Sequence, residues 1–112
     1  MVTRNYLTEE VKENPHMVDV RKLYDKESAQ IMHMTLKPGQ SLKPHKTPVD
    51  VVFYILEGNA TVQVGEEVMT FGPDTLVESP AFIVHCLSNE GTADTRIMVI
   101  KAPKPVAATK LL

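Results

Sequence analysis

Short runs of alternating apolar and polar residues, separated by turn signals, constrain the fold of this 112-residue chain more than any other feature. About nine such runs follow one another at intervals of roughly 8 to 12 residues. Within a strand, residues two positions apart project to the same face, so each run can bury one face. Glycine pairs with proline, asparagine or glutamate in the turns at residues 38–39, 58–59, 65–66 and 72–73. The pattern predicts an all-β sandwich or barrel.

The runs define one domain with short ends. We expect the barrel to occupy residues 17–103, a polar N-terminal segment residues 1–16, and a C-terminal tail residues 104–112. In the N-terminal segment, Thr8 precedes two glutamates and predicts one helical turn, which Pro15 would end. A chain of this size can bury a single hydrophobic core but has no room for a second.

Composition and charge exclude several classes of protein. The chain is 43% hydrophobic and 23% charged, which is typical of an ordinary globular protein and argues against disorder. Its net charge is −2 and its lysines are scattered, so neither nucleic acid nor an anionic membrane is expected as a partner. Cys86 is the only cysteine, which excludes an intramolecular disulfide and favours a reducing compartment. No signal peptide or spanning segment is visible, and we therefore expect a cytoplasmic protein.

Two histidines make the constellation that can carry chemistry. His45 lies in a polar run that leads, through Lys46, Thr47 and Pro48, into the apolar run VDVVFYILE. His85 has a similar setting in SPAFIVHCLSNEG. Imidazole nitrogens are good ligands for divalent transition metals. The two histidines are therefore candidate metal ligands at the mouth of a β-structure with an apolar interior.

These two segments resemble the signature motifs of the cupin superfamily, whose members are small double-stranded β-helices of the jelly-roll type. The first motif has a glycine, a His-x-His pair, a glutamate and a second glycine at fixed spacings, and Gly39, His45 and Gly58 fall at three of these places. The resemblance extends from about residue 18 to residue 103. It implies a cupin-type jelly-roll barrel but no single activity, because this fold hosts isomerases, dioxygenases, storage proteins and ligand sensors.

The second motif matches in part. It has a glycine, a Pro-x-Gly group, a histidine and an asparagine, and Pro80, His85 and Asn89 occur at the expected spacing. Asp74 stands at the place of the first glycine and Phe82 at that of the second. The resemblance implies that Asn89 belongs to the pocket lining and that Phe82 narrows the pocket mouth.

The chain lacks two ligands that the resemblance implies for metal-dependent cupins. Thr47 stands where the second histidine would be, and Val51 stands where the glutamate would be. Both lie an even number of residues from His45, so we expect them to line the pocket together with Phe53. A divalent Mn, Fe, Ni or Zn ion would then have only His45 and His85 as ligands.

His33 is a candidate third ligand. It would converge with the other two histidines if Ile31, His33 and Thr35 face the interior of the barrel. The alternative is a histidine that is hydrogen-bonded on the barrel wall or buried in a dimer interface. Of the remaining candidates, His16 reads as a surface residue, and Cys86 reads as a small hydrophobe facing away from the pocket.

Two function classes follow from these residues. The first is a cupin barrel that binds a divalent metal ion, a small molecule or both, without an assignable catalytic activity. The second is a metal-dependent enzyme of the dioxygenase or isomerase type with a three-histidine centre. An inward His33 would favour the enzyme, and an outward His33 with Val51 in the pocket would favour the binding protein. We also expect a homodimer, because apolar residues occupy both faces of the N-terminal strands.

Overall fold

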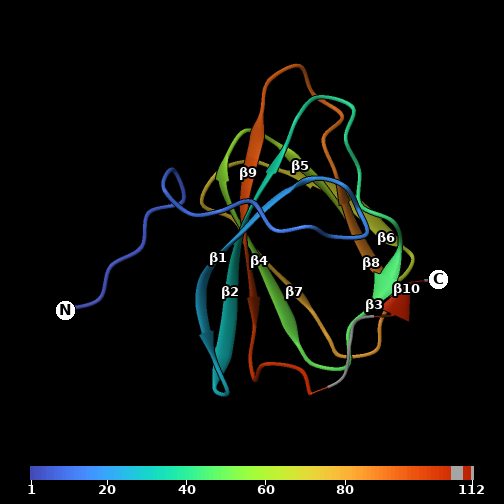
Figure 1. Ribbon diagram of the computed structural model, residues 1–112. Coiled ribbons are helices and arrows are strands. Elements are labelled where there is room, and N and C mark those ends of the chain that lie inside the picture. Colours follow the sequence, from blue (N-terminus) through green and yellow to red (C-terminus); the bar gives the residue numbers. More distant parts are fainter. Residues whose placement is uncertain (107–109, 112) are drawn as a thin grey trace.

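Two five-stranded antiparallel sheets face each other in a computed structural model of the chain, which describes residues 1–106 and 110–111 (Figure 1). The first sheet has the strand order β1-β2-β9-β4-β7 and the second β10-β3-β8-β5-β6. The strands are β1 (Asp19–Lys26), β2 (Ala29–Leu36), β3 (His45–Lys46), β4 (Val51–Glu57), β5 (Ala60–Val64), β6 (Glu67–Phe71), β7 (Leu76–Ser79), β8 (His85–Ser88), β9 (Thr95–Lys101) and β10 (Lys110–Leu111). The predicted double-stranded β-helix is confirmed. β1 to β9 correspond to the nine predicted runs.

Alternation along the central strands of the first sheet decides which side chains enter the barrel. In β4 the buried positions are Val51, Phe53 and Ile55, and the residues between them are partly exposed. The strand register sets Phe53 opposite Val99, and Val99 opposite Met32. These side chains therefore form a continuous apolar row across three strands, which is the wall of the core.

Two residues further along β9, toward the end of the barrel, the inward row of side chains becomes partly polar. Lys101 is paired with Gln30 on one side and with Val51 on the other. In β9, Lys101 lies two positions beyond Val99, so both side chains are on the same face of the strand. The first sheet thus carries an apolar row with a partly polar row directly above it.

The second sheet places the two motif histidines side by side. β3 pairs with β8 through His45 and His85, which occupy directly opposite positions. Both histidines are buried, as is Leu87 two positions along β8. His45 and His85 therefore face the interior of the barrel, and they line the same cavity as Gln30 and Lys101 of the first sheet.

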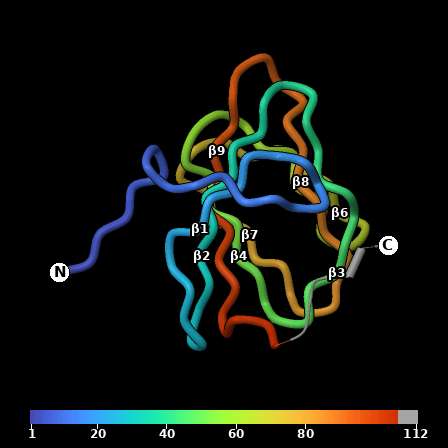
Figure 2. Tube along the Cα trace, in the orientation of Figure 1, coloured from blue at the N-terminus to red at the C-terminus, as the bar shows by residue number. Residues whose placement is uncertain are grey.

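The N-terminal segment runs across the barrel before it enters β1 (Figures 1 and 2). The prediction of a helical turn that begins at Thr8 is wrong. Residues 6–9 form a turn instead, and no residue of 1–106 or 110–111 is α-helical. The residue that organises this turn is Asn5, whose carbonyl accepts from the amides of Thr8 and Glu9. No described residue lies in a helix that is long and apolar enough to cross a membrane.

The C-terminal end contains one strand that the sequence did not predict. β10 pairs with β3, and Lys110 lies opposite Lys46 in this pairing. The predicted tail, residues 104–112, lies partly outside the described residues. β10 extends the second sheet beside the strand that carries His45.

Four positions of the cupin-like motifs have left-handed backbones: Gly39, Gly58, Asp74 and Phe82. Gly58 has φ +75°, and a Cβ atom there would lie 2.5 Å from the carbonyl oxygen of Asp94, so only glycine fits. Asp74 and Phe82, which replace motif glycines, have φ values of 62° and 65°. The chain therefore keeps a glycine-like backbone at both places, although neither residue is a glycine.

Candidate functional site

A cavity of about 210 Å³ lies between the two sheets beside the motif histidines. Its walls are mostly apolar, and Val20, Met32, Met34, Leu42, Val51, Phe53 and Val99 supply them. Its polar lining comes from Gln30, His45, Thr47, His85 and Lys101, and from residues 14–16 of the N-terminal segment. Among the described residues that line it, none is an aspartate or a glutamate. Apolar walls with a few convergent polar groups are typical of a small-molecule site.

The imidazoles of His45 and His85 are joined in one hydrogen-bonded chain. Nδ1 of His45 lies 2.7 Å from the carbonyl oxygen of Lys43, which can only accept, so Nδ1 carries the proton and Nε2 has a free lone pair. The Nε2 atoms of the two rings are 3.0 Å apart, and His85 is therefore the donor. Nδ1 of His85 in turn accepts from the hydroxyl of Ser79 at 2.7 Å. Both imidazoles are neutral in this arrangement.

Burial keeps these imidazoles neutral. It lowers the pKa of His85 to about 4, helped by the nearby His45 and Lys101. Burial also lowers the pKa of His45, although its hydrogen bond to the Lys43 carbonyl acts in the opposite direction. A second positive charge is unfavourable here, because Lys101 is close and water is excluded. The pocket thus presents neutral imidazole groups at neutral pH.

Thr47 and Val51 occupy the places of the two missing ligands, and both line the pocket. The Thr47 hydroxyl oxygen lies 3.4 Å from Nε2 of His85. The Val51 side chain is 1% exposed. The neighbouring carboxylate of Asp50 faces outward and accepts a hydrogen bond from the amide of Ala81. No carboxylate therefore reaches the histidine pair from β4.

Phe53 also lines the pocket, with its ring edge-on to His85 at a centroid distance of 5.2 Å.

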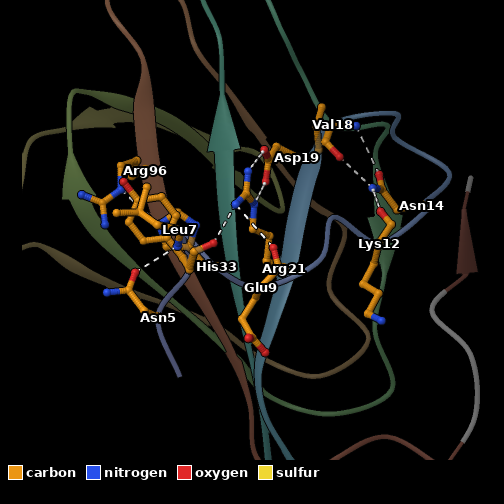
Figure 3. Close-up of polar contacts among 11 residues, drawn as sticks. Asn5, Leu7, Glu9, Lys12, Asn14, Val18, Asp19, Arg21, His33 and Arg96 are labelled. Carbon is orange, nitrogen blue, oxygen red and sulfur yellow. Dashed lines mark hydrogen bonds and ion pairs between the residues drawn. The ribbon is translucent and has the colours of Figure 1, made fainter. Parts of the chain in front are cut away.

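His33 does not belong to this site. The hypothesis that it converges with the other two histidines is wrong, because β2 directs Met32 and Met34 into the cavity and His33 to the outer face of the sheet. There its ring stacks on Tyr6 at a centroid distance of 4.0 Å. Its Nε2 accepts from Nε of Arg96 at 3.1 Å, and Figure 3 shows His33 beside Arg96. His33 is nevertheless buried, because the N-terminal segment covers it.

A small polar cluster fixes that segment over His33. The Arg96 guanidinium lies over the Tyr6 ring at 4.3 Å, a cation–π distance. Arg21 donates to the carbonyl oxygen of Tyr6. Arg21 is itself held by the carboxylate of Asp19 (Figure 3). Nδ1 of His33 is buried and finds no hydrogen-bond partner within residues 1–106 and 110–111. Burial, followed by the positive charge of Arg96, lowers the pKa of His33 to about 4.

His16 lines the pocket, although the sequence suggested a surface residue. Its Nδ1 accepts from the amide of Lys43, and its ring lies 4.8 Å from that of His45. Asn14 holds this loop in place by donating to the carbonyl oxygen of Val18. No local pattern marks His16, because residues 14–16 reach the pocket only through the path of the whole N-terminal segment.

Lys101 is the other pocket residue that sequence reasoning missed. Burial lowers the pKa of its ammonium group. A usable signal existed: in TRIMVIK the apolar residues Ile97 and Val99 occupy every second position, and Lys101 continues the same face. The other residues on this face of β9 are uncharged, so the single lysine at its end was overlooked.

Two predicted lining residues lie elsewhere. Phe82 does not narrow the pocket mouth; its side chain is 65% exposed, because its left-handed backbone turns it outward. Asn89 is buried, but it serves the barrel wall: its amide donates to the carbonyl oxygens of Leu36 and Ala93, and its side-chain oxygen accepts from Gly91. Cys86 is half-buried outside the pocket, and its thiol donates to Gln63.

The potential metal ligands of the pocket are too few for a tightly bound ion. Structural zinc sites have four protein ligands, and catalytic ones have three. Among the described residues, no group of three or more histidine, cysteine, aspartate or glutamate side chains is arranged to hold an ion. Nearby Lys101 also opposes a cation. The residues of this pocket therefore do not fit a tightly held, resident metal.

Known proteins resemble this chain both in sequence and in fold. The model of the cupin domain matches residues 32–101, which is more than half of the chain. TT1209 from Thermus thermophilus is similar in structure, with 29% identity, a TM-score of 0.81, and coverage of 94% of this chain and 100% of that one. No curated protein matches the chain.

More distant structures share the fold. An RmlC-like cupin from Methanocaldococcus jannaschii has 24% identity and a TM-score of 0.73, over 86% of this chain and 89% of that one. The polyketide cyclase RemF from Streptomyces resistomycificus has 16% identity and a TM-score of 0.85, over 100% of this chain and 85% of that one. The fold and its histidine-lined pocket define a small jelly-roll barrel protein. The chain belongs to the cupin family.

Proposed function

We propose that this cupin binds a small organic molecule in its barrel pocket. The observation that carries the proposal is the pocket itself, which has mostly apolar walls. Its polar groups come from both sheets: His45 and His85 from the second, and Gln30 and Lys101 from the first. Apolar walls supply affinity by excluding water, and a few fixed polar groups orient the ligand.

The imidazole pair supplies that orientation. His45 and His85 are held from behind by Lys43 and Ser79, so their rings cannot turn freely. Their facing Nε2 atoms offer one donor and one acceptor. A ligand hydroxyl or carboxyl group beside the pair can donate to Nε2 of His45 or accept from Nε2 of His85 when a small shift of the rings opens the hydrogen bond between them. This geometry favours ligands that have a hydroxyl or a carboxyl group.

The chain provides its own reporters for a test. Methionines labelled with ¹³C in the methyl group give separate NMR signals; Met32 and Met34 line the pocket, whereas Met17 and Met69 are exposed. Titration with a library of single-ring alcohols, amides and acids is expected to shift the Met32 and Met34 signals and leave those of Met17 and Met69 in place.

Variants locate the binding. Val99→Phe fills the cavity and should abolish these shifts. Val68→Phe, which enlarges an exposed residue of β6, should preserve them. If no compound shifts the Met32 and Met34 signals of the parent protein, the proposal fails.

A second candidate is an exchangeable divalent ion on the same pair. The observation in its favour is the convergence of two neutral imidazoles, whose Nε2 atoms are 3.0 Å apart. Mn, Fe, Ni or Zn would then have His45 and His85 as protein ligands, and such an ion would supply a Lewis acid in the pocket. Equilibrium dialysis of the protein against each ion, followed by elemental analysis of both compartments, tests this. A stoichiometric metal would support the second candidate over the first.

The enzyme with a three-histidine centre is not proposed. It depended on His33, whose ring lies on the outer face of the first sheet against Tyr6. The inward Val51 also favours the binding function, because it places an apolar side chain where a carboxylate ligand would be needed.

A further inference from the structure

We propose that residues 13–17 form a lid over the pocket, held closed by a hydrogen bond from the backbone amide of Lys43 to the imidazole of His16. This inference rests on the proposed function and adds the route by which a small molecule enters the cavity. It is drawn from the place of these residues on the pocket, from their internal hydrogen bonds, and from the contacts at both ends of the lid.

The lid covers one side of the cavity. Asn14, Pro15 and His16 line it together with side chains of both sheets. Figure 2 shows the N-terminal segment crossing from the side of β1 toward the second sheet and returning into β1. Glu13, Pro15 and Met17 are exposed, whereas Asn14 and His16 between them are half-buried. The lid therefore has an outer side in water and an inner side that faces the cavity.

The side chain of Asn14 gives the lid a shape of its own. Its amide group donates to the carbonyl oxygens of Lys12 and Val18. Its side-chain oxygen accepts from the backbone amides of His16 and Val18. These bonds join residues of the segment 12–18 to one another, as is typical of turns built on asparagine. The lid can therefore move as one unit without losing them.

The chain is fixed to the barrel on either side of the lid. Before it, the backbone amide of Lys12 donates to the carbonyl oxygen of Val20 at 2.7 Å. After it, Val18 is buried as part of the hydrophobic core. Motion can thus be confined to residues 13–17, and opening does not require the N-terminal segment to leave the barrel.

His16 joins the lid to the far side of the cavity. Its Nδ1 accepts from the backbone amide of Lys43 at 2.9 Å, in the segment before β3. Its ring lies 4.8 Å from that of His45, with an angle of 46° between the ring planes. A neutral hydrogen bond of this kind changes an equilibrium constant by only roughly fivefold. The lid can therefore open while the barrel stays folded, and opening would uncover His45.

Hydrogen exchange tests the lid without any ligand. The amide of Lys43 donates to His16, whereas the amide of the preceding residue, Leu42, donates to the carbonyl oxygen of Leu87 in the barrel wall. Opening of the lid breaks the first bond and leaves the second. We expect the Lys43 amide to be protected, but at least about tenfold less than that of Leu42. Equal protection would show that the lid opens only when the barrel unfolds, and would overturn the inference.

Entry into the cavity is measured with tert-butyl hydroperoxide, a small organic molecule that oxidises methionine to its sulfoxide. Met32 and Met34 line the cavity, and the exposed Met69 is the internal standard. Mass spectrometry gives the initial rate at each methionine. His16→Ala removes the acceptor for the Lys43 amide, so it should raise the rates at Met32 and Met34 about fivefold relative to Met69.

Two further variants separate this hydrogen bond from a general loosening of the loop. His16→Asn keeps an acceptor, its side-chain oxygen, and should retain the slow oxidation and the protection of the Lys43 amide. Glu13→Ala removes an exposed side chain of the lid and should match the parent protein. Unchanged oxidation of Met32 and Met34 in His16→Ala would overturn the inference, as would an equal acceleration in Glu13→Ala.

The outcomes distinguish the two proposals. Neither measurement uses a ligand of the pocket, so failure of the lid leaves small-molecule binding intact. A pocket that binds none of the library compounds would end the proposed function and, with it, the role of the lid in ligand entry. If His16→Ala does not fold, the exchange rates of Leu42 and Lys43 in the parent protein still decide whether the lid opens.

Discussion

The Nε2 atoms of His45 and His85 face each other at 3.0 Å across adjacent strands of the second sheet. Their outer nitrogens are held by the Lys43 carbonyl and the Ser79 hydroxyl, so the pair is a fixed part of the barrel wall. What the pair binds therefore depends on the residues around it. Here those residues are Thr47, Val51 and Lys101, none of which is an acid.

Restoring the two missing ligands should create a tight metal site. Thr47→His combined with Val51→Glu adds an imidazole and a carboxylate beside His45 and His85, because both positions line the same cavity. We expect Mn²⁺, Fe²⁺ or Ni²⁺ to raise the melting temperature of this double variant more than that of the parent, since more ligands and a negative charge favour the ion. Thermal melts with and without each metal measure the difference.

Without metal, the double variant should be less stable than the parent, because the new carboxylate is buried. Its cross-strand neighbour Lys101 would offset part of this cost. A parent protein that responds to metal as strongly as the double variant would show that its own site is already complete.

Protonation of His33 should destabilise the protein in mild acid. Its pKa is lowered from 6.5 to about 4 in the folded state, so the unfolded chain binds the proton first as the pH falls. The stabilisation is complete above pH 6.5 and is lost as the pH falls from 6.5 to 4, by about 1.4 kcal/mol per pH unit at most. Denaturant unfolding at several pH values in this window measures the slope.

The His33→Gln variant isolates this contribution. Glutamine keeps an acceptor for Arg96 but does not titrate, so the variant should take up about one proton fewer on unfolding in the same pH window. Thr35→Ser, two positions along the same face of β2, is the matched control and should keep the parent slope. An unchanged slope in His33→Gln would contradict the assignment.

Replacing Phe82 with glycine should stabilise the fold. Phe82 has φ 65° and a largely exposed side chain, so the substitution relieves backbone strain and sacrifices little burial. A left-handed non-glycine residue costs about 1–2 kcal/mol, and the extra chain entropy of glycine offsets about 0.5–1 kcal/mol. We expect a net gain of about 0.5–1 kcal/mol in the free energy of unfolding.

Ile83→Gly is the control for this substitution. Ile83 is also partly exposed and adjacent in sequence, but its φ is not positive. The control should therefore lose stability. Loss of stability in Phe82→Gly as well would refute the strain argument.

We propose that the protein is a homodimer, as the sequence suggested. The outer face of the first sheet carries Ile31, Ile100 and Val52 in directly neighbouring register positions, and all three are partly exposed. A row of this kind favours association with a second copy. Sedimentation at micromolar concentration should show a dimer, and Ile100→Lys should dissociate it. A parent protein that sediments as a monomer would end the proposal.

The sequence alone determined the barrel and part of the site. Strand alternation and turn chemistry are local properties, and they were enough to predict β1 to β9 and the hairpin at Gly65-Glu66. The motif spacing also singled out His45 and His85. In the structure they occupy opposite positions on paired strands, so their side chains lie on the same face of the sheet.

Only the tertiary structure decided the remaining residues of the site. A pattern with period two divides β2 into two faces but does not say which one is inside, so the sequence left the direction of His33 open. His16 reaches the pocket through a loop that has no periodicity, and the role of Lys101 depends on its pairing with Gln30 and Val51. These contacts join segments that are far apart in the chain. Their geometry is fixed by the packing of the two sheets and not by any local pattern.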